Sequence, residues 1–244
     1  MHCQVLQSDV VYFFVGKNQK QFTIHQALES SFPRKALEPA MIESIDEEVF
    51  GRCCEFVYSG DYSALCPVPQ SSGNGTPQPE NRETQCQEEA NRWDSSSLNF
   101  NLFHPKGLLL NYDILLAELG HTLRSGSEKD LSNDPFTSYA AVFLSYAEIH
   151  RFGVRTGWLS LIVLSFYRLL RLLENFTLFE ERTGDIVQLL VFVFEDGEYM
   201  EQLEVMLRDY MVWNVETLMR NADFKSFLGR NLSLEQTVFR SMWK

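Results

Sequence analysis

The chain opens with two short apolar runs separated by a polar stretch, a pattern that predicts a β-hairpin. The runs cover residues 10–15 and 21–24 and are rich in β-branched and aromatic side chains, which favour strands. The polar residues 16–20 between them are expected to form the turn. A helical segment is expected to begin near His25.

A helical pattern follows between residues 46 and 60. Three acids, Asp46, Glu47 and Glu48, precede a set of apolar residues that have the spacing of one helical face. Acids are favoured at a helix N-terminus and glycine just beyond the C-terminus, where Gly60 stands. The pattern predicts one amphipathic helix whose apolar face holds Val49, Phe50, Cys53, Phe56 and Val57.

The composition changes abruptly at residue 66. Residues 66–97 are rich in Pro, Ser, Gly, Gln, Glu and Asn, and such a stretch buries too little apolar area to offset its ordering entropy. We therefore expect residues 66–135 to be a low-complexity, largely disordered insertion. Apolar character returns at residues 98–123, which either pack back on the parent domain or form a short recognition helix for a partner.

Helical periodicity returns near Ser138 and continues to the end of the chain. One helix is expected before Gly153, where the pattern breaks, and a second from Gly157. The apolar run that begins at Trp158 contains Arg168 and Arg171 and is too short for a membrane span, so we interpret it as a buried helix. Three further helical segments are expected at residues 182–194, 199–221 and 222–228, with a strand as the alternative for the first because of its β-branched residues.

Charge and cysteine content narrow the classes of function. The formal net charge of −12 argues against binding nucleic acid through its phosphates, because that mode needs a basic face. The five cysteines include no C-x-x-C pair, which indicates neither a disulfide framework nor a thiolate metal site and favours a reducing compartment. The N-terminus shows no secretory signal pattern. We expect an intracellular protein of the cytoplasm, the nucleus or both.

A search for catalytic or cofactor chemistry finds no motif. The five histidines show no metal-ligand spacing, and His25 is interpreted as a structural residue between strand and helix. Arg182 and Asp185 are interpreted as a surface ion pair. The sequence predicts no catalytic residue, no cofactor, no metal and no enzymatic activity. The alternative is an enzyme whose residues converge only in space, which requires a pocket with two titratable groups in reach of each other.

Taken in order, these segments resemble the BTB/POZ domain, and most closely the BTB proteins of fungi. The resemblance is carried by Ser8-Asp9-Val10-Val11, by residues 22–28, by Met41-Ile42-Glu43-Ser44 and by residues 46–62, and it continues in the helices after residue 136. It implies an α+β fold with a short hairpin flanked by a helical cluster. On this reading the domain combines residues 1–65 with 136–174, residues 66–135 are inserted, and residues 175–244 form a C-terminal helical extension.

Two features depart from the family pattern. A segment of roughly ten residues that carries a short strand is missing between Ser44 and Ile45, so the three-stranded layer is expected to be incomplete. Pro33 and Pro39 stand where the family is helical, and a proline inside a helix costs about 3 kcal/mol. Both features suggest, as an alternative, a degenerate paralogue with a shortened domain.

The resemblance implies a non-enzymatic protein–protein interaction module. Two roles follow from it: a substrate adaptor for a cullin-based ubiquitin ligase, or a homo-oligomerisation module. In the family, the apolar-x-Glu element that corresponds to Met41, Ile42 and Glu43 lies near the cullin surface, and methionine suits such adaptable contacts. These three residues are the candidate partner-binding site, although Met41 packing inside its own domain is an equal alternative.

The expected partners are proteins, either a cullin scaffold or a second copy of the chain. We expect no direct contact with nucleic acid, no membrane association and no small-molecule substrate. An alternative role is that of a transcription-regulator partner without a DNA-binding domain of its own, because the acidic balance would require another protein to contact DNA.

Overall fold

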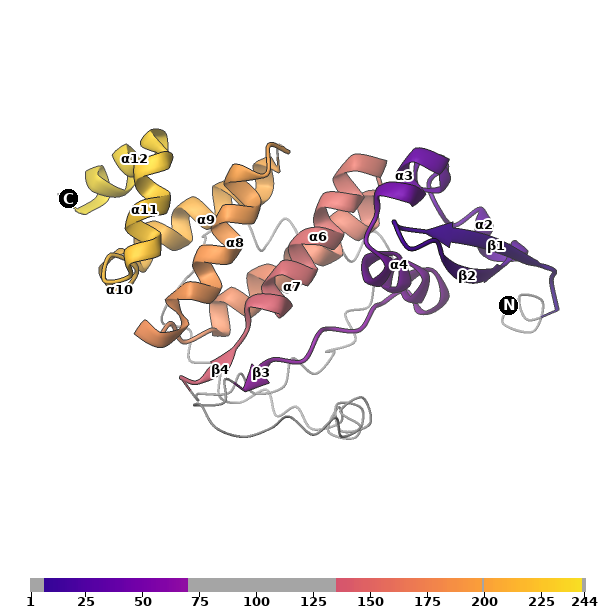
Figure 1. Ribbon diagram of the computed structural model, residues 1–244, viewed down its shortest axis with the longest axis horizontal. Coiled ribbons are helices and arrows are strands. Elements are labelled where there is room, and N and C mark those ends of the chain that lie inside the picture. The colour runs from indigo at the N-terminus through magenta and orange to yellow at the C-terminus, as the bar shows by residue number, and fades with distance from the viewer. Residues whose placement is uncertain (1–6, 70–134, 199, 243–244) are drawn as a thin grey trace. The chain divides into compact units, whose positions relative to one another are not determined.

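The computed structural model describes residues 7–69, 135–198 and 200–242 (Figure 1). These residues form a mixed and mostly helical α+β fold, which confirms the expected class. The chain divides into two compact units. Unit 1 combines Met1–Ala64 with Ser145–Ser165, and unit 2 combines Leu65–Leu144 with Phe166–Lys244.

Unit 1 begins with the predicted hairpin. Strands β1 (Val10–Val15) and β2 (Lys20–His25) pair antiparallel, with Val10 opposite His25 and Val15 opposite Lys20. The turn requires glycine at position 16, where φ is +71° and an added Cβ would lie 2.9 Å from Cγ of Glu47. The sheet has two strands, so among the described residues no third strand joins it.

Three short helices follow the hairpin: α2 (Gln26–Glu29), the 3-10 helix η1 (Arg34–Leu37) and α3 (Pro39–Ser44). Both prolines stand at helix starts. Pro33 directly precedes η1, and Pro39 is the first residue of α3. A proline at the first helical position leaves no hydrogen bond unmade, because that N–H has no partner within the helix in any case. The expectation that both prolines disrupt helical structure is therefore wrong.

Helix α4 (Glu47–Ser59) matches the predicted amphipathic helix. The side chain of Asp46 caps its start by accepting a hydrogen bond of 2.8 Å from the backbone N–H of Glu48. Gly60 ends it in the left-handed conformation, with φ of +77°, and donates its N–H to the carbonyl of Phe56. The acids and the glycine have the positions that the sequence predicts, and the cap by Asp46 is an additional contact.

An aromatic cluster forms the core of unit 1. Phe50 of α4 lies 5.1 Å from the ring centroid of Phe22 on the inner face of the hairpin and 6.1 Å from that of Phe32. Trp158, which comes from the second stretch of the unit, lies 5.2 Å from Phe32 and 5.5 Å from Phe56. The two stretches of unit 1 therefore share one core.

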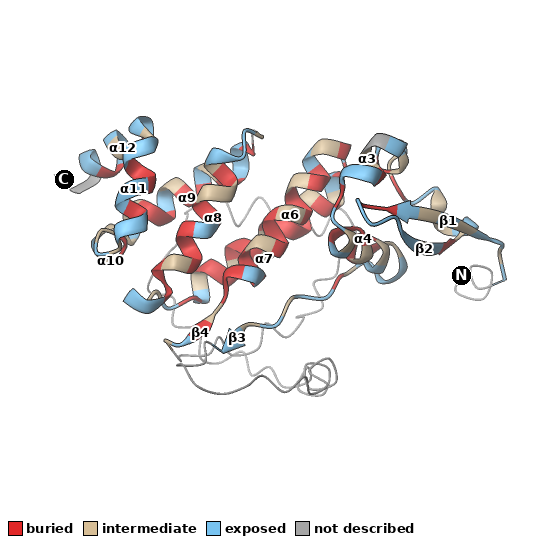
Figure 2. Ribbon diagram, in the orientation of Figure 1, coloured by how far each residue is buried: buried red, intermediate tan, exposed pale blue. Residues whose placement is uncertain are grey.

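Helices α6 (Ala140–Thr156) and α7 (Leu159–Asn175) contribute residues to both units, and more than half of the residues in each are buried (Figure 2). The prediction that Gly153 breaks the first of them is wrong, since α6 continues through it to Thr156. An added Cβ on Gly153 would lie 2.9 Å from Cγ1 of Ile162, so glycine allows the close approach of α7. None of the helices in the described ranges is both long and apolar enough to cross a membrane.

Unit 2 contains a short ladder and a run of helices. Strand β3 (Val68–Pro69) pairs antiparallel with β4 (Thr137–Ser138). The predicted insertion lies almost wholly outside the described residues, as do residues 98–123. The elements after α7 are η2 (Glu180–Arg182), α8 (Thr183–Glu195), α9 (Glu201–Trp213), α10 (Val215–Leu218), α11 (Ala222–Arg230) and α12 (Leu232–Met242).

Arg182 and Asp185 are buried, so the prediction of a surface ion pair is wrong. The guanidinium of Arg182 lies 5.2 Å from the ring centroid of Tyr139 and 5.4 Å from that of Phe176. Asp185 accepts a hydrogen bond of 2.7 Å from the backbone N–H of Tyr139 and one of 2.9 Å from the hydroxyl of Ser138. The carboxylate thus accepts hydrogen bonds from the residues just before α6. It lies at the N-terminal end of that helix, where a negative charge is favourable.

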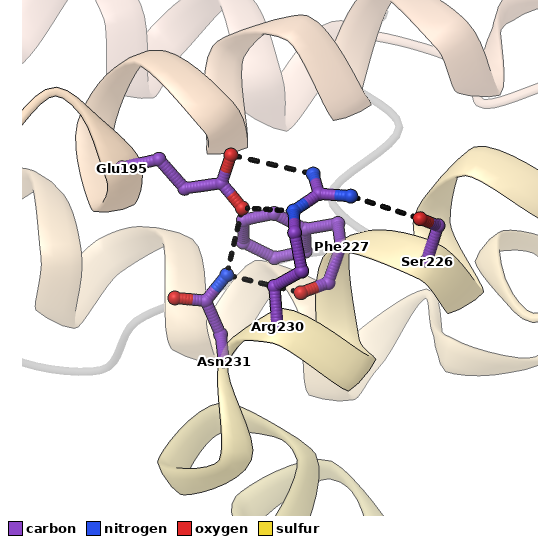
Figure 3. Close-up of polar contacts among 5 residues, drawn as sticks. All are labelled: Glu195, Ser226, Phe227, Arg230 and Asn231. Carbon is purple, nitrogen blue, oxygen red and sulfur yellow. Dashed lines mark hydrogen bonds and ion pairs between the residues drawn. The ribbon is translucent and has the colours of Figure 1, made fainter.

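A polar network joins α8 to α11 (Figure 3). Arg230 donates to both carboxylate oxygens of Glu195, at 2.9 and 3.3 Å, and to the hydroxyl of Ser226 at 2.8 Å. Asn231 donates its amide to Glu195 and to the carbonyl of Phe227, both at 3.0 Å. The hydrogen bond from Arg230 lowers the pKa of Glu195. The network holds the end of α11 against α8.

Candidate binding surface

The structure separates the three candidate residues on α3. Ile42 is buried, and its carbonyl accepts a hydrogen bond of 3.0 Å from the backbone N–H of Gly16. Met41 is half-buried and Glu43 is exposed. Ile42 therefore belongs to the core of unit 1, and only Met41 and Glu43 remain accessible to a partner.

A larger accessible surface lies on the hairpin, where the sequence suggested no site. Val10, Tyr12 and Phe14 alternate along β1 and are 41%, 56% and 53% exposed. We call these three side chains the β1 face. They point away from the core because the intervening residues Val11 and Phe13 turn toward α4, as Phe13 shows by its 6.1 Å approach to Phe50. The apolar run alone did not signal this face, because such a run is equally typical of a strand that is buried on both sides.

Three hydrogen bonds show which backbone groups of the hairpin point outward. Gln26 donates its N–H to the carbonyl of Asp9 at 2.7 Å, so Asp9 faces β2. Gly16 donates its N–H away from β2, to Ile42, and His25 donates its N–H away from β1, to the hydroxyl of Tyr58 at 3.0 Å. Because the two directions alternate along an antiparallel strand, the N–H and C=O groups of even-numbered β1 residues point away from β2.

The outer edge of β1 is consequently open. Within the described ranges, no hydrogen bond occupies the outward N–H and C=O groups of Val10, Tyr12 and Phe14. The outer edge of β2 is different, because Tyr58 of α4 covers it at His25 and also makes a 2.7 Å contact with Nδ1 of that histidine. The β1 face and the β1 edge therefore belong to the same three residues.

Of the two free cysteines in the described ranges, Cys53 is buried and Cys54 is half-buried. Burial raises the pKa of Cys54 to about 12 and that of Cys53 well above its ordinary value, so both thiols stay protonated at neutral pH. Cys66 is disulfide-bonded, a bond that the cysteine spacing in the sequence did not indicate. His150 lies 3.3 Å from the hydroxyl of Ser165, and both residues are buried between α6 and α7.

Metal-binding chemistry was not expected from the sequence. Among the residues that the structure describes, no three His, Cys, Asp or Glu side chains gather closely enough to hold a metal ion. The β1 face of unit 1 is apolar and aromatic, and α3 presents Met41 and Glu43.

Comparison with known proteins gives no assignment. No protein-family model, no curated protein and no solved structure matches the chain. The similarity to the BTB/POZ domain stays a prediction from the residues. The β1 face and the accessible part of α3 are the features of unit 1 on which a function can be based.

Proposed function

We propose that the chain is a non-enzymatic protein–protein interaction module of BTB/POZ type, with unit 1 as its binding part. The observation that carries the proposal is the β1 face, where three neighbouring apolar side chains are each about half exposed. Aromatic residues are enriched at protein interfaces because they supply large apolar area with few rotatable bonds. Covering such a face gains roughly 25 cal/mol for each Å² of apolar surface removed from water.

Two partners are proposed for this module. The first is a cullin, for which the chain would serve as a ubiquitin-ligase substrate adaptor, with Met41 as the apolar contact and Glu43 in the polar rim. The second is another copy of the chain, held through the β1 face. Ile42 supports both roles indirectly, because its burial and its hydrogen bond to Gly16 hold α3 against the hairpin.

Size-exclusion chromatography with light scattering tests the function, first on the chain alone and then in a mixture with a cullin N-terminal domain. A cullin adaptor forms a stoichiometric complex that is lost in the double variant Met41→Asp, Glu43→Lys. The matched control is Ala27→Asp, which adds a charge at an exposed residue of α2. This control is expected to leave the complex intact.

The remaining outcomes separate the alternatives. A folded chain that neither self-associates nor binds the cullin contradicts the proposed function. A complex that survives the double variant on α3 contradicts the adaptor geometry. An expanded chain without a cooperative unfolding transition supports a degenerate paralogue.

A further inference from the structure

We propose that the disulfide of Cys66 is a redox-sensitive switch, which a low-molecular-weight thiol opens and the corresponding disulfide closes again. The switch lies in unit 2 and is independent of the interaction function proposed for unit 1. Three observations support it: the exposure of Cys66, the protection of the other described thiols, and the position of Cys66 next to the β3–β4 ladder.

Cys66 is both bonded and exposed. Its sulfur belongs to a disulfide, and the residue is exposed in the irregular stretch between α4 and β3. Structural disulfides resist reduction by the glutathione pool, whereas exposed ones are typically labile and regulatory. Residues 62–70 contain no charged side chain. An attacking thiolate therefore meets no fixed negative charge in the adjoining chain.

The cysteine content favours a sensing role for this bond. It predicts a reducing compartment, where disulfides are usually transient and either catalytic or redox-sensing. Catalysis needs a reactive thiol of lowered pKa beside the bond. Cys53 and Cys54, the free thiols of the described ranges, both have a raised pKa. Redox sensing is therefore the role that fits Cys66.

The two free thiols are protected from exchange with the bond. The thiolate and not the thiol attacks a disulfide, and burial on α4 keeps Cys53 and Cys54 protonated at neutral pH. The redox chemistry of the described cysteines is thus confined to Cys66.

The exchange balances with a thiol such as glutathione as the reductant. One glutathione thiolate attacks the sulfur of Cys66, the S–S bond breaks, and the partner cysteine leaves as a thiolate that takes up a proton. A second glutathione thiolate attacks the glutathione sulfur of this mixed disulfide, which frees the Cys66 thiol and releases glutathione disulfide. Two glutathione thiols are oxidised and one protein disulfide is reduced, and the reverse sequence closes the bond.

The bond adjoins the smaller of the two described sheets. Strand β3 begins two residues after Cys66, and it pairs Val68 with Ser138 and Pro69 with Thr137 (Figure 1). A ladder of two residue pairs is marginal by itself. A covalent restraint two residues away limits fraying of β3, so opening the disulfide is expected to loosen the ladder.

A redox titration of the full chain tests the switch. The chain is equilibrated with mixtures of glutathione and glutathione disulfide, free thiols are trapped with a maleimide, and peptide masses locate the label. Cys66 is expected to become labelled as reduced glutathione reaches millimolar concentration. Cys53 and Cys54 are expected to react at least tenfold more slowly until denaturant is added. A Cys66 that stays bonded in millimolar glutathione is structural, and this result would overturn the switch.

Peptide mapping without reduction tests the bond itself. Because Cys53 and Cys54 are free, the second sulfur belongs to Cys3 or Cys86, which lie outside the described residues. Trypsin places Cys66 in the peptide of residues 53–82, Cys3 in residues 1–17 and Cys86 in residues 83–92. The peptide of residues 53–82 is expected to be linked to one of the other two and to separate from it on reduction. If it is linked to neither in the oxidised chain, the proposal is wrong.

Amide hydrogen exchange measures the structural response. In the reduced chain the amides of β3 and β4 are expected to exchange at least tenfold faster, while those of α8 stay unchanged. Cys66→Ser is expected to show the fast exchange in both redox states. Cys54→Ser is the matched control, since it removes a free thiol and is expected to keep the redox dependence.

Failure of the switch and failure of the proposed function are separate results. Exchange in β3 and β4 that is the same in oxidised and reduced wild-type chain contradicts the switch, and this measurement needs no variant. It leaves the interaction function untouched, because that function is tested by the cullin mixture and by self-association.

Discussion

Gly153 allows two buried helices to approach each other closely. Its missing side chain leaves room for Ile162, whose Cγ1 and backbone nitrogen would lie 2.9 Å and 3.2 Å from an added Cβ. The nitrogen belongs to the backbone of α7 and cannot rotate away. A glycine inside a helical pattern is ambiguous in sequence, because it is found both where a helix ends and where two helices pack closely.

Gly153→Ala is expected to lower the free energy of unfolding by about 1–3 kcal/mol, since overpacking outweighs the gain in helix propensity of about 1 kcal/mol. Urea denaturation measures the change. The control is Gly229→Ala on α11, where nothing lies within 4 Å of an added Cβ. That variant is expected to be neutral or stabilising, and equal effects at both positions would contradict the packing role of Gly153.

His150 makes stability dependent on pH. Burial lowers the pKa of His150 from its ordinary 6.5 to about 4, although a hydrogen bond to the carbonyl of Ile162 opposes the shift. Below pH 6.5 the unfolded chain takes up a proton that the folded chain does not, so stability falls as pH is lowered toward 4. The expected loss between pH 7 and pH 4 is on the order of 3 kcal/mol.

The contribution of His150 is isolated by comparison with His150→Gln, which cannot titrate. Glu148 on the same helix acts in the opposite direction, because burial and the nearby Asp46 raise its pKa, and it is present in both proteins. Urea midpoints at pH 7, 5.5 and 4 are expected to fall less steeply in the variant. Parallel pH profiles for the two proteins would show that His150 is not the group responsible.

Among the elements, α4 carries the clearest local signals for its boundaries. The side chain of Asp46 accepts the N–H of Glu48, and Gly60 adopts the left-handed conformation that ends the helix. Asp46→Ala is expected to reduce the free energy of unfolding by about 1 kcal/mol, because one N–H of the first turn loses its partner. Asp46→Asn keeps the cap and is expected to retain most of this stability, as judged by thermal unfolding. A loss of equal size in both variants would assign the effect to charge.

Elements with local signals could be predicted from the sequence, and those that depend on packing could not. The hairpin and α4 were predicted because turn residues, caps and the apolar period lie within the elements themselves. The continuous helix α6 was missed because the reason for Gly153 is a contact with Ile162 on another helix. The burial of Arg182 depends on the rings of Tyr139 and Phe176, which no local pattern around η2 reveals.

The candidate binding surface, too, could be predicted from the sequence only in part. The sequence drew attention to Met41, Ile42 and Glu43 through a family resemblance, and the structure buries the middle residue of the three. The β1 face was missed because apolar strands usually mean burial on both sides. Only the two-stranded sheet shows that one side of β1 is left uncovered.

At the scale of the whole molecule, unit 1 is assembled from two distant stretches of chain. Trp158 comes from the second stretch, and its ring lies against Phe32 and Phe56 of the first. Trp158→Ala is expected to destabilise unit 1 by about 3–5 kcal/mol, as is typical of a large buried aromatic residue. Amide hydrogen exchange is expected to show the loss of protection in β1, β2 and α4.

Trp158→Phe is the conservative control, because it retains an aromatic ring between the same two neighbours. We expect it to restore most of the protection in the hairpin and α4. Unchanged exchange in the hairpin of Trp158→Ala would mean that residues 7–64 are stable without the second stretch.

The division of unit 1 also has a consequence for biosynthesis. The ribosome must add a further 101 residues (165 − 64) before the unit has all of its parts. At roughly 5–20 residues per second this takes about 5–20 s, a long interval compared with the folding of a hairpin. Until then the nascent chain lacks Trp158, so the aromatic core around Phe32 and Phe56 stays incomplete. Newly made chains are therefore expected to be ready substrates for ribosome-associated chaperones.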